Sequence, residues 1–184
     1  MWDRLARTVA PAVPVSLQDF RAHSRVAVDD PDASLMEHYL ATAAALVEGP
    51  GGVGFCLNDQ TWTLTLDRFS DPIEIPLRPV TSIVTVAYLD GDGASQVVDA
   101  GDYRLLKAGR LARVEPVEAW PATAQDRLEA VIVTFKAGSG VPPEVKQFII
   151  LAAAYWYENR EAGPDLPRNI FHLVEPYRSQ WVAA

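Results

Sequence analysis

Cysteine is nearly absent from this sequence of 184 residues, since Cys56 is the only one. A single cysteine cannot form an internal disulfide, so the chain is not a small disulfide-stapled scaffold, and a reducing compartment is the simplest interpretation. Cys56 stands among apolar residues in "VGFCLND", with no adjacent base or cation that would activate its thiol. We therefore expect it to be a packed core residue.

Basic residues and long apolar runs are also scarce. The 16 Lys and Arg face 24 Asp and Glu, a formal net charge of -8, which disfavours tight binding to nucleic acid because phosphate contacts need clustered cations. The longest apolar run, Phe148 to Tyr157, is shorter than the roughly 20 residues of a membrane-spanning helix. The N-terminal segment is broken by Pro11 and Pro14 and does not resemble a secretory signal. We expect a globular protein made in the cytoplasm, with no membrane partner.

Motifs that carry chemistry are missing or incomplete. His23, His38 and His172 lack metal-ligand spacing, and no Gly-x-Ser-x-Gly elbow is present. The glycines of 49–54, "GPGGVG", match a dinucleotide fingerprint, but they follow a helical pattern instead of a strand, which favours a helix end and a flexible loop. Residues 90–93, "DGDG", resemble the start of a calcium loop but lack the closing Glu, which favours a turn. We predict no enzyme activity, no cofactor and no metal.

Two short helices are predicted near the N-terminus. In "PVSLQDFRAHSRV", Ser16 is a plausible N-cap and Asp19 follows three residues later, as in a capping box. In "DDPDASLMEHYLATAAALVEG", Asp30 or Asp32 can cap a helix whose apolar residues recur at helical spacing until Gly49. The signals for each of these helices lie within one short segment of the sequence.

Alternating polar and apolar residues replace the helical period from Gln60 to about Ala137. The segment "QTWTLTLDRF" alternates threonines with Trp62 and two leucines, as a strand with one buried face does. Further strands are predicted in "SIVTVAYL", "SQVVD", "DYRLL", "RLARVEP" and "EAVIVTFKAG". The region is therefore expected to form a small antiparallel sheet or sandwich.

A long helix is predicted in "GVPPEVKQFIILAAAYWYENREAGP". Pro142 and Pro143 suit its first turn, and Gly163 with Pro164 should end it. A weaker helix follows in "PRNIFHLVEPYRSQW", interrupted near Pro176.

Together these patterns predict an α+β fold: a helical bundle formed by N- and C-terminal helices, with an inserted small antiparallel β-domain. The expected organisation is an N-terminal extension at 1–13, bundle helices at 14–58, the β-domain at 59–140, and a long helix with a docking tail at 141–184.

The long helix is apolar around most of its circumference. If Trp156 faces the core, then Tyr157, Ala154 and Ile150 lie to the side and need another neighbour. Such a helix is either central in its domain or covered by another subunit. Because the expected domain has few helices, we favour an oligomer interface over purely intramolecular packing.

The chain resembles the phage head-tail connector, or adaptor, proteins in their long form with a β-rich insertion. The similarity runs in order through "PVSLQDFRAHSRV", "DDPDASLMEHYLATAAALVE", "QTWTLTLDRF", "IEIPLRPVTSIVTVAYLDGDG", "DYRLL" and "PPEVKQFIILAAAYWYENREA". It covers about Pro14 to Ala162, and the closing "WYENREA" is its most specific part. The segment "MWDRLARTVAPAVP" lies outside the pattern.

This resemblance implies a structural subunit of the neck of a tailed phage or a gene transfer agent. It implies a homo-oligomeric ring, expected to be dodecameric, that binds the portal protein, extends the DNA channel and meets a stopper or tail-terminator protein. DNA would pass through without tight binding. The ring-wall role is carried to the residues at the end of the long helix, namely Tyr155, Trp156, Tyr157, Glu158, Arg160 and Glu161.

The C-terminal segment is expected to dock onto the portal. Its aromatic and basic residues are poorly placed to bury themselves in so short a segment, although local packing back onto the sheet is nearly as plausible. The residues concerned are Phe171, Tyr177, Arg178 and Trp181.

Other functional classes stay open at this point. A head-completion or tail-terminator subunit would also be a small ring-forming protein. A tail-associated carbohydrate-binding β-module is suggested by the strands and Trp62, but it gives no account of the long helix. A small hydrolase would need a nucleophile and a base that the sequence does not display together.

Overall fold

The computed structural model describes residues 4–8, 12–108, 111–124, 127–160 and 165–178. Four α-helices and two antiparallel sheets make up these residues, which confirms the expected α+β class. The chain divides into two compact units. One comprises the described residues of Met1–Ala10 and Asp59–Ser139, and the other those of Pro11–Asn58 and Gly140–Ala184. Each unit is therefore assembled from segments that are distant in the sequence.

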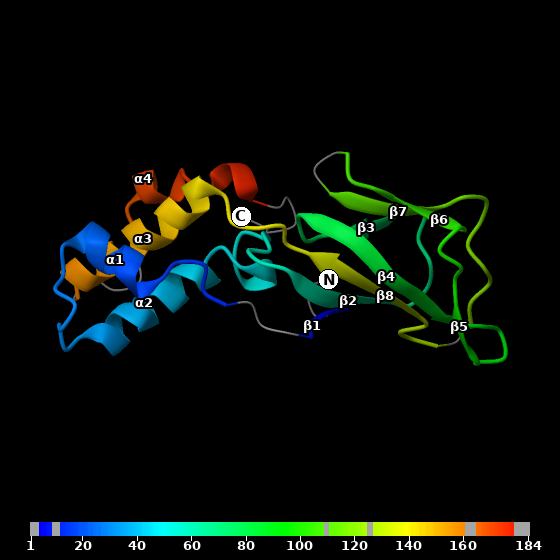
Figure 1. Cartoon of the computed structure of the whole chain (residues 1–184). Helices are drawn as coiled ribbons and strands as arrows, with labels where there is room; N and C mark the ends of the chain where they lie inside the picture. Colours follow the sequence, from blue (N-terminus) through cyan, green and yellow to red (C-terminus); the bar gives the residue numbers. More distant parts are fainter. Residues whose placement is uncertain (1–3, 9–11, 109–110, 125–126, 161–164, 179–184) are drawn as a thin grey trace. The chain divides into compact units, whose positions relative to one another are not determined.

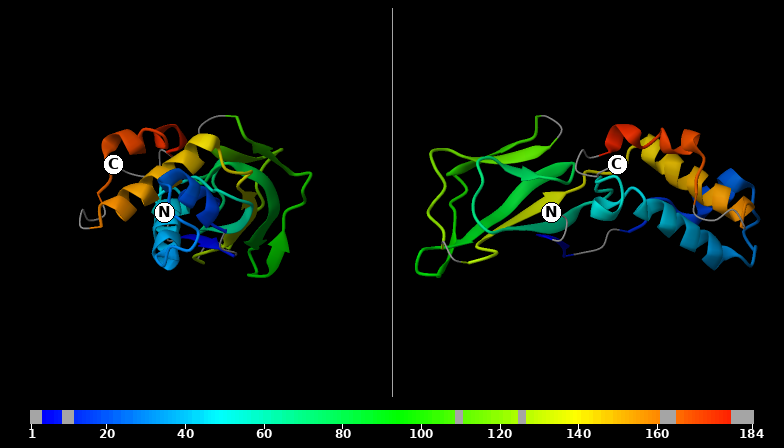
Figure 2. Two further views of the ribbon diagram at one scale, coloured as in Figure 1. Left: turned by 60° about the vertical axis from the view of Figure 1, so that its left-hand side comes forward. Right: turned by 180° about the vertical axis from the view of Figure 1, so that it is seen from behind.

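The helical unit is organised around the long helix α3 (Pro143–Glu158). It packs most extensively against α2 (Ala33–Ala45), and also contacts α1 (Leu17–Ser24) and α4 (Arg168–Phe171). Figures 1 and 2 show α2 and α3 side by side, although they come from opposite ends of the chain. The short 3-10 helices η2 (Gly49–Gly51) and η3 (Glu175–Tyr177) complete the unit.

The start of α1 follows the sequence signal. Ser16 is the N-cap, and its hydroxyl accepts a hydrogen bond of 3.1 Å from the Asp19 N–H. The Asp19 carboxylate accepts in return from the Ser16 N–H at 3.4 Å. This reciprocal pair satisfies N–H groups that have no partner within the helix, and the predicted capping box is confirmed.

The end of α3 lies earlier than predicted. The helix stops at Glu158 instead of continuing to Gly163, because Asn159 leaves helical geometry at φ -116° and ψ 57°. Both the backbone N–H and the side-chain amide of Asn159 donate to the Tyr155 carbonyl, at 2.9 and 2.8 Å. An asparagine that satisfies a terminal carbonyl in this way ends the helix without a glycine.

The glycine-rich segment after α2, predicted as a helix end and loop, is held by backbone hydrogen bonds. Gly49 has φ 55° and its N–H donates to the Phe55 carbonyl at 3.0 Å, while the Gly54 N–H donates to the Gly49 carbonyl at 3.1 Å. The side chains that follow, including Phe55, Cys56 and Leu57, are buried. The loop thus folds back onto the end of α2 and contributes to the core.

The β unit contains a five-stranded sheet in the order β1-β2-β8-β4-β5 and a three-stranded sheet in the order β3-β7-β6, both antiparallel (Figure 1). The bounds of the strands are β1 Leu5–Arg7, β2 Gln60–Leu66, β3 Ile73–Ile75, β4 Val80–Leu89, β5 Ser95–Val97, β6 Tyr103–Leu106, β7 Ala112–Pro116 and β8 Val131–Ala137.

Alternating residues of the long strands form the core of the β unit. In β2, Gln60, Trp62 and Leu64 are buried while the threonines between them are partly exposed, which is the alternation that the sequence predicts. The N-terminal residues had no role in the sequence prediction, but Leu5–Arg7 form the edge strand β1 beside β2. The Asp90–Gly93 segment is a turn, as expected, with its Asp90 carboxylate accepting from the N–H groups of Asp92 and Ala94.

Candidate functional site

The aromatic triplet of α3 is placed largely within the chain's own core. Trp156 is 6% exposed, whereas Tyr155 and Tyr157 are half-buried and pack against the same core. Ala152, Ala153 and Ala154 are consecutive and all buried. Most of the neighbours that the helix needs are therefore supplied by α1, α2 and α4, and central burial was underestimated because helices from both chain ends converge on α3.

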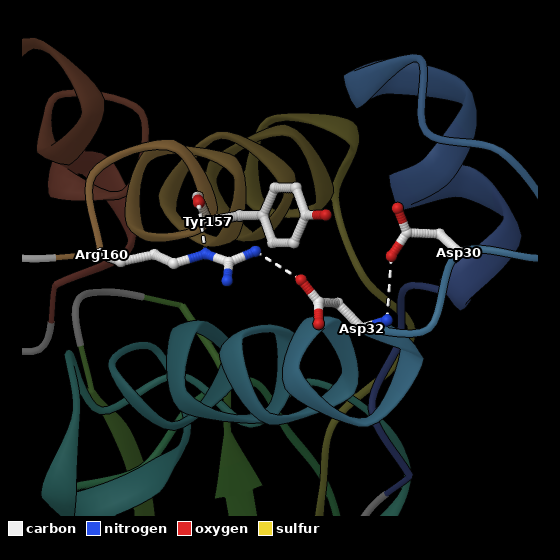
Figure 3. A network of polar contacts seen from close by, with 4 residues as sticks. All are labelled: Asp30, Asp32, Tyr157 and Arg160. Atoms are coloured by element: carbon white, nitrogen blue, oxygen red, sulfur yellow. Dashed lines mark hydrogen bonds and ion pairs between the residues drawn. The ribbon is translucent and has the colours of Figure 1, made fainter.

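Arg160 and Asp32 join the end of α3 to the start of α2 (Figure 3). The Arg160 guanidinium donates to the Asp32 carboxylate at 2.5 Å and lies over the Tyr157 ring, 5.1 Å from its centroid. The Asp32 N–H donates to Asp30 at 2.9 Å. Tyr157 in turn meets Phe20 of α1 edge to face, with ring centroids 5.8 Å apart. We call Asp32, Tyr157 and Arg160 the α2–α3 clasp.

The electrostatics of the clasp are those of a surface ion pair. The hydrogen bond to Asp32 raises the pKa of Arg160 above its ordinary value, so the guanidinium stays charged. Its side chain is 51% exposed and that of Asp32 is 37% exposed, so solvent screens their attraction. A carboxylate on a neighbouring molecule could therefore replace Asp32 at the Arg160 guanidinium with little loss of free energy.

Among the residues that the structure describes in α1 and α3, three polar side-chain atoms are buried without a hydrogen-bond partner: Arg21 Nε, Ser24 Oγ and Trp156 Nε1. Arg21 also lines an open groove of about 560 Å³ along α1, together with Leu17, Gln18, Ala22, Arg25, Val26 and Val28. The lining of this groove is largely apolar and includes the side chains of Arg21 and Arg25. Sequence reasoning missed it, because it depends on how α1 meets the loop that follows it.

Two of the expected docking residues pack back onto the helical unit. Phe171 contacts Phe148 with ring centroids 5.7 Å apart, and Tyr177 meets Phe55 edge to face at 5.2 Å. The Tyr177 hydroxyl donates to Glu144 at 3.1 Å, and burial, followed by this carboxylate, raises the pKa of Tyr177. These contacts anchor the described part of the tail on its own helical unit, chiefly along α3.

The remaining expected site residues are exposed or fall outside the described part of the chain. Glu158, Arg160 and Arg178 are exposed. Glu161 and Trp181 lie outside the described residues.

The β unit does not present Trp62 as a platform for sugar binding. Trp62 is 4% exposed, and its indole N–H donates to Gln60 at 3.1 Å. The partly exposed aromatic pair is Phe69 with Trp120, stacked at 4.6 Å between centroids. These rings hold loops together, because the Trp120 N–H donates to the Ser70 carbonyl at 3.0 Å.

An open cavity of about 840 Å³ lies beside these loops and is lined by Asp67, Arg68, Phe69, Pro121, Ala122, Thr123, Ala124, Arg127 and Leu128. Its carboxylate, Asp67, is engaged by Arg4 at 2.8 Å and by the Glu129 N–H at 3.1 Å. Within the described residues, no group of three or more His, Cys, Asp and Glu could hold a metal ion. His172 faces Glu175 at 2.9 Å.

Across the part of the chain that the structure describes, no helix is long and apolar enough to cross a membrane. The cavity and the groove described above are both open, so the features with room for a macromolecular partner are surfaces: the exposed end of α3, the α1 groove and the faces of the sheets.

Comparison with known proteins finds similarity among solved structures. No family model matches the chain, and no curated protein matches it either. A chain from the neck of an empty gene transfer agent (GTA) particle, computed with C6 symmetry, is 25% identical with a TM-score of 0.78. A chain from the virion of a native GTA particle is 25% identical with a TM-score of 0.75.

A third similar chain comes from the neck of a native GTA particle computed with C12 symmetry, at 26% identity and a TM-score of 0.70. In all three cases the match covers 95% of this chain and 95% of the other. Both units of the present chain are therefore included, and its fold is that of a chain found in GTA particles.

Proposed function

We propose that this chain is a structural subunit of the neck of a phage-like particle, and within the neck the head-tail adaptor that forms a ring beneath the portal. The observation that carries the proposal is the likeness to GTA neck chains over 95% of both partners. A likeness that spans the helical unit and the β unit together supports a shared role better than a match to either unit alone would.

A ring fits both the comparison and the chain itself. The similar chains belong to necks computed with C6 and C12 symmetry, which supports an oligomeric ring, and the dodecamer is our proposal for its size. In a cyclic ring each contact joins two different surfaces of the subunit. The exposed end of α3 would supply one of them.

We assign the ring-wall role to the end of α3, with Glu158 and Arg160 as the exposed contacts. Tyr155 and Tyr157 would add partly buried aromatic area to the contact with the neighbouring subunit. Trp156 would hold these two residues in position from the core. Glu161 is the last residue of the proposed set. The clasp gives Arg160 a defined position before assembly, because Asp32 and the Tyr157 ring hold its side chain. A preset side chain loses less conformational entropy on binding.

The portal-docking role is proposed for the C-terminal segment. Phe171 and Tyr177 would act as internal anchors that direct the segment, while Arg178 and Trp181 would meet the portal. The chain's charge of -8 suits a conduit, since a like-charged wall offers DNA no strong phosphate contact. The role is non-enzymatic, in keeping with neighbours that are components of particles.

The test is the mass of the purified full chain by light scattering, alone and mixed with a portal ring of the same particle. One copy added per portal subunit is the expected result. A head-completion or tail-terminator subunit would instead show no binding to the portal ring alone and would bind the assembled neck. A stable monomer that binds neither would overturn the proposal.

Arg160→Ala tests the ring-wall role within that assay. We expect weaker ring formation with little change in thermal unfolding, because an exposed ion pair contributes little to stability. The matched control is Arg168→Ala, which removes an exposed arginine from α4. Unchanged assembly of the Arg160 variant would remove this residue from the proposed interface.

A further inference from the structure

The outer face of the five-stranded sheet has an unusual composition. Paired residues on neighbouring strands share a face, and successive residues in a strand alternate between faces. Since Trp62, Val86 and Val133 are buried on one side, the register fixes the residues of the other side. These are Ala6, Thr61, Thr63, Thr65, Ser82, Thr85, Ala87, Leu89, Ser95, Val97, Ile132, Thr134 and Lys136.

Among the described residues of these strands, the outer face holds no Asp or Glu. We call it the carboxylate-free face. The chain has 24 acidic residues, so their absence from its largest sheet surface is notable. Lys136 is the one charged residue in the set.

The three-stranded sheet shows what an ordinary solvated face of this protein looks like. On its exposed side Glu74 pairs with Arg113, with a nitrogen–oxygen distance of 3.1 Å, and Arg104 lies opposite Glu115. Opposite charges alternate across these strands. The lack of acidic residues is therefore specific to the carboxylate-free face and is not shared by the exposed face of the other sheet.

Apolar side chains on the carboxylate-free face remain open to solvent in the single chain. Ile132 is 40% exposed and Val97 is 64% exposed, and both are paired with Ala87. Val84, which lies at the bulge in β4 and outside this set, is 47% exposed. Ile132, Ala87 and Val97 form an apolar row across three strands, and such a row gains free energy when another protein surface covers it.

We propose that the carboxylate-free face is a contact surface for a second copy of this chain, an inference that rests on the proposed ring. Each copy carries a net charge of -8, so two copies brought together repel each other through any contact that includes acids on both sides. A face without carboxylates removes that repulsion locally. The contact is head-to-tail, so Lys136 would meet an acidic group on a different surface of the next copy.

Duplex DNA fits this face less well. One lysine cannot supply the several phosphate contacts on which DNA affinity depends. The exposed Ile132 and Val97 would gain nothing beside a hydrated polyanion. A protein surface is the occupant that uses both the apolar row and the missing acids.

The carboxylate-free face is smaller than a standard protein–protein interface. A standard interface uses about 20–30 residues on each side, and the carboxylate-free face supplies about half of that number. It would therefore act together with a second surface, for which the end of α3 is the candidate already proposed.

A charge placed at the centre of the face tests the inference. Thr134 is paired with both Thr63 and Thr85, and we expect Thr134→Asp to lower the ring-bound fraction at least about tenfold, because a buried unpaired carboxylate is costly at an interface. Thr134→Val keeps the shape without charge and should assemble normally. Leu106→Asp introduces the same charge on the three-stranded sheet, where the residue is 40% exposed, and should also assemble.

Thermal unfolding of all three variants separates loss of assembly from loss of fold. If Thr134→Asp is unstable, Lys136→Glu, at an exposed position of the same face in the central strand β8, serves as a second variant with the same expected defect. If the wild-type chain forms no ring, the proposed function fails and the inference with it. If the wild-type ring forms and both charged variants join it as readily, the inference alone is overturned.

Photo-crosslinking identifies the occupant directly. A photoreactive amino acid in place of Lys136 in the full chain should crosslink to a peptide of a second copy within assembled rings. Crosslinks exclusively to the portal, to another neck protein or to DNA would overturn the inference, as would assembled rings without crosslinks.

Discussion

Gly52 shows how one residue can be fixed by its neighbours and not by its backbone angle. A Cβ at this position would lie 2.5 Å from the Leu46 carbonyl oxygen and 2.6 Å from the Val47 carbonyl carbon, both backbone atoms of the segment that leads into the loop. Its φ of -115° is open to any residue. Close packing of the loop on the end of α2 therefore requires glycine here.

We predict that Gly52→Ala lowers the free energy of unfolding by about 1–3 kcal/mol, the range for forcing an extra methyl group into a packed site. Gly51→Ala is the control, since a Cβ there meets nothing within 4 Å. Urea unfolding followed by circular dichroism measures both. Equal stability of the two variants would mean that the loop is looser than its hydrogen bonds indicate.

Asp67 links the N-terminal residues to the β unit and should make stability depend on pH. The hydrogen bond from Arg4, followed by that from the Glu129 N–H, lowers the pKa of Asp67 in the folded chain. A carboxylate with a lowered folded pKa stabilises the fold above its unfolded pKa of about 3.9. That contribution is lost as the pH falls through the folded pKa.

We therefore expect Asp67→Asn to flatten the acid side of the stability profile below about pH 5, with a smaller difference between neutral and acidic melting temperatures than in the wild type. Glu118→Gln, an exposed carboxylate of the same unit, is the comparison. Melting curves from pH 7 down to about pH 3 provide the measurement. Parallel profiles for the wild type and Asp67→Asn would contradict the assignment.

At the scale of elements, α1 depends on its first turn more than on its length. The helix spans Leu17–Ser24, and only Phe20 within it is buried. An isolated helix this short is marginal, so the capping box and the contact with α3 hold it in place.

Ser16→Ala should cost about 1 kcal/mol in unfolding free energy, the usual loss for an N-cap. Ser34→Ala, an exposed serine within α2, is a matched change without a cap and should have little effect. Hydrogen exchange of the α1 amides would locate the loss in that helix. Unchanged exchange there would show that packing on α3 alone maintains α1.

The elements also show which predictions from sequence succeed. The box of Ser16 and Asp19, the strand alternation around Trp62 and the proline start of α3 depend on neighbours in the chain, and each is found where it was predicted. The end of α3 was wrong because Gly163 and Pro164 were read as the stop, while Asn159 had already satisfied the last carbonyl.

At the scale of the whole molecule, charge should govern how copies associate. Each chain carries -8, and salt screens repulsion over distances of about 10 Å at 0.1 M. We predict that self-association into rings strengthens as NaCl rises from about 20 to 200 mM, since the screening length is about three times shorter at the higher salt.

Light scattering at fixed protein concentration checks this prediction. Sodium sulfate at matched ionic strength tests whether the effect follows screening and not the chloride ion. A ring that weakens with salt would instead indicate that attractive charge pairs, such as those available to Arg160 and Lys136, dominate the contact.

The sequence by itself determined the α+β class and the approximate positions of most helices and strands, because these follow from local periodicity, caps and residue types. It could not determine that α3 would be central to its unit, that Leu5–Arg7 would pair with β2, or that Phe171 and Tyr177 would turn inward.

Only the tertiary structure decided which surfaces remain for a partner. The carboxylate-free face is composed of residues from five strands that are scattered through the chain, and no window of sequence contains it. Likewise, Arg160 and Asp32 are 128 residues apart and meet only because α2 and α3 pack together. Local chemistry specifies elements, whereas the juxtaposition of distant segments specifies a binding surface.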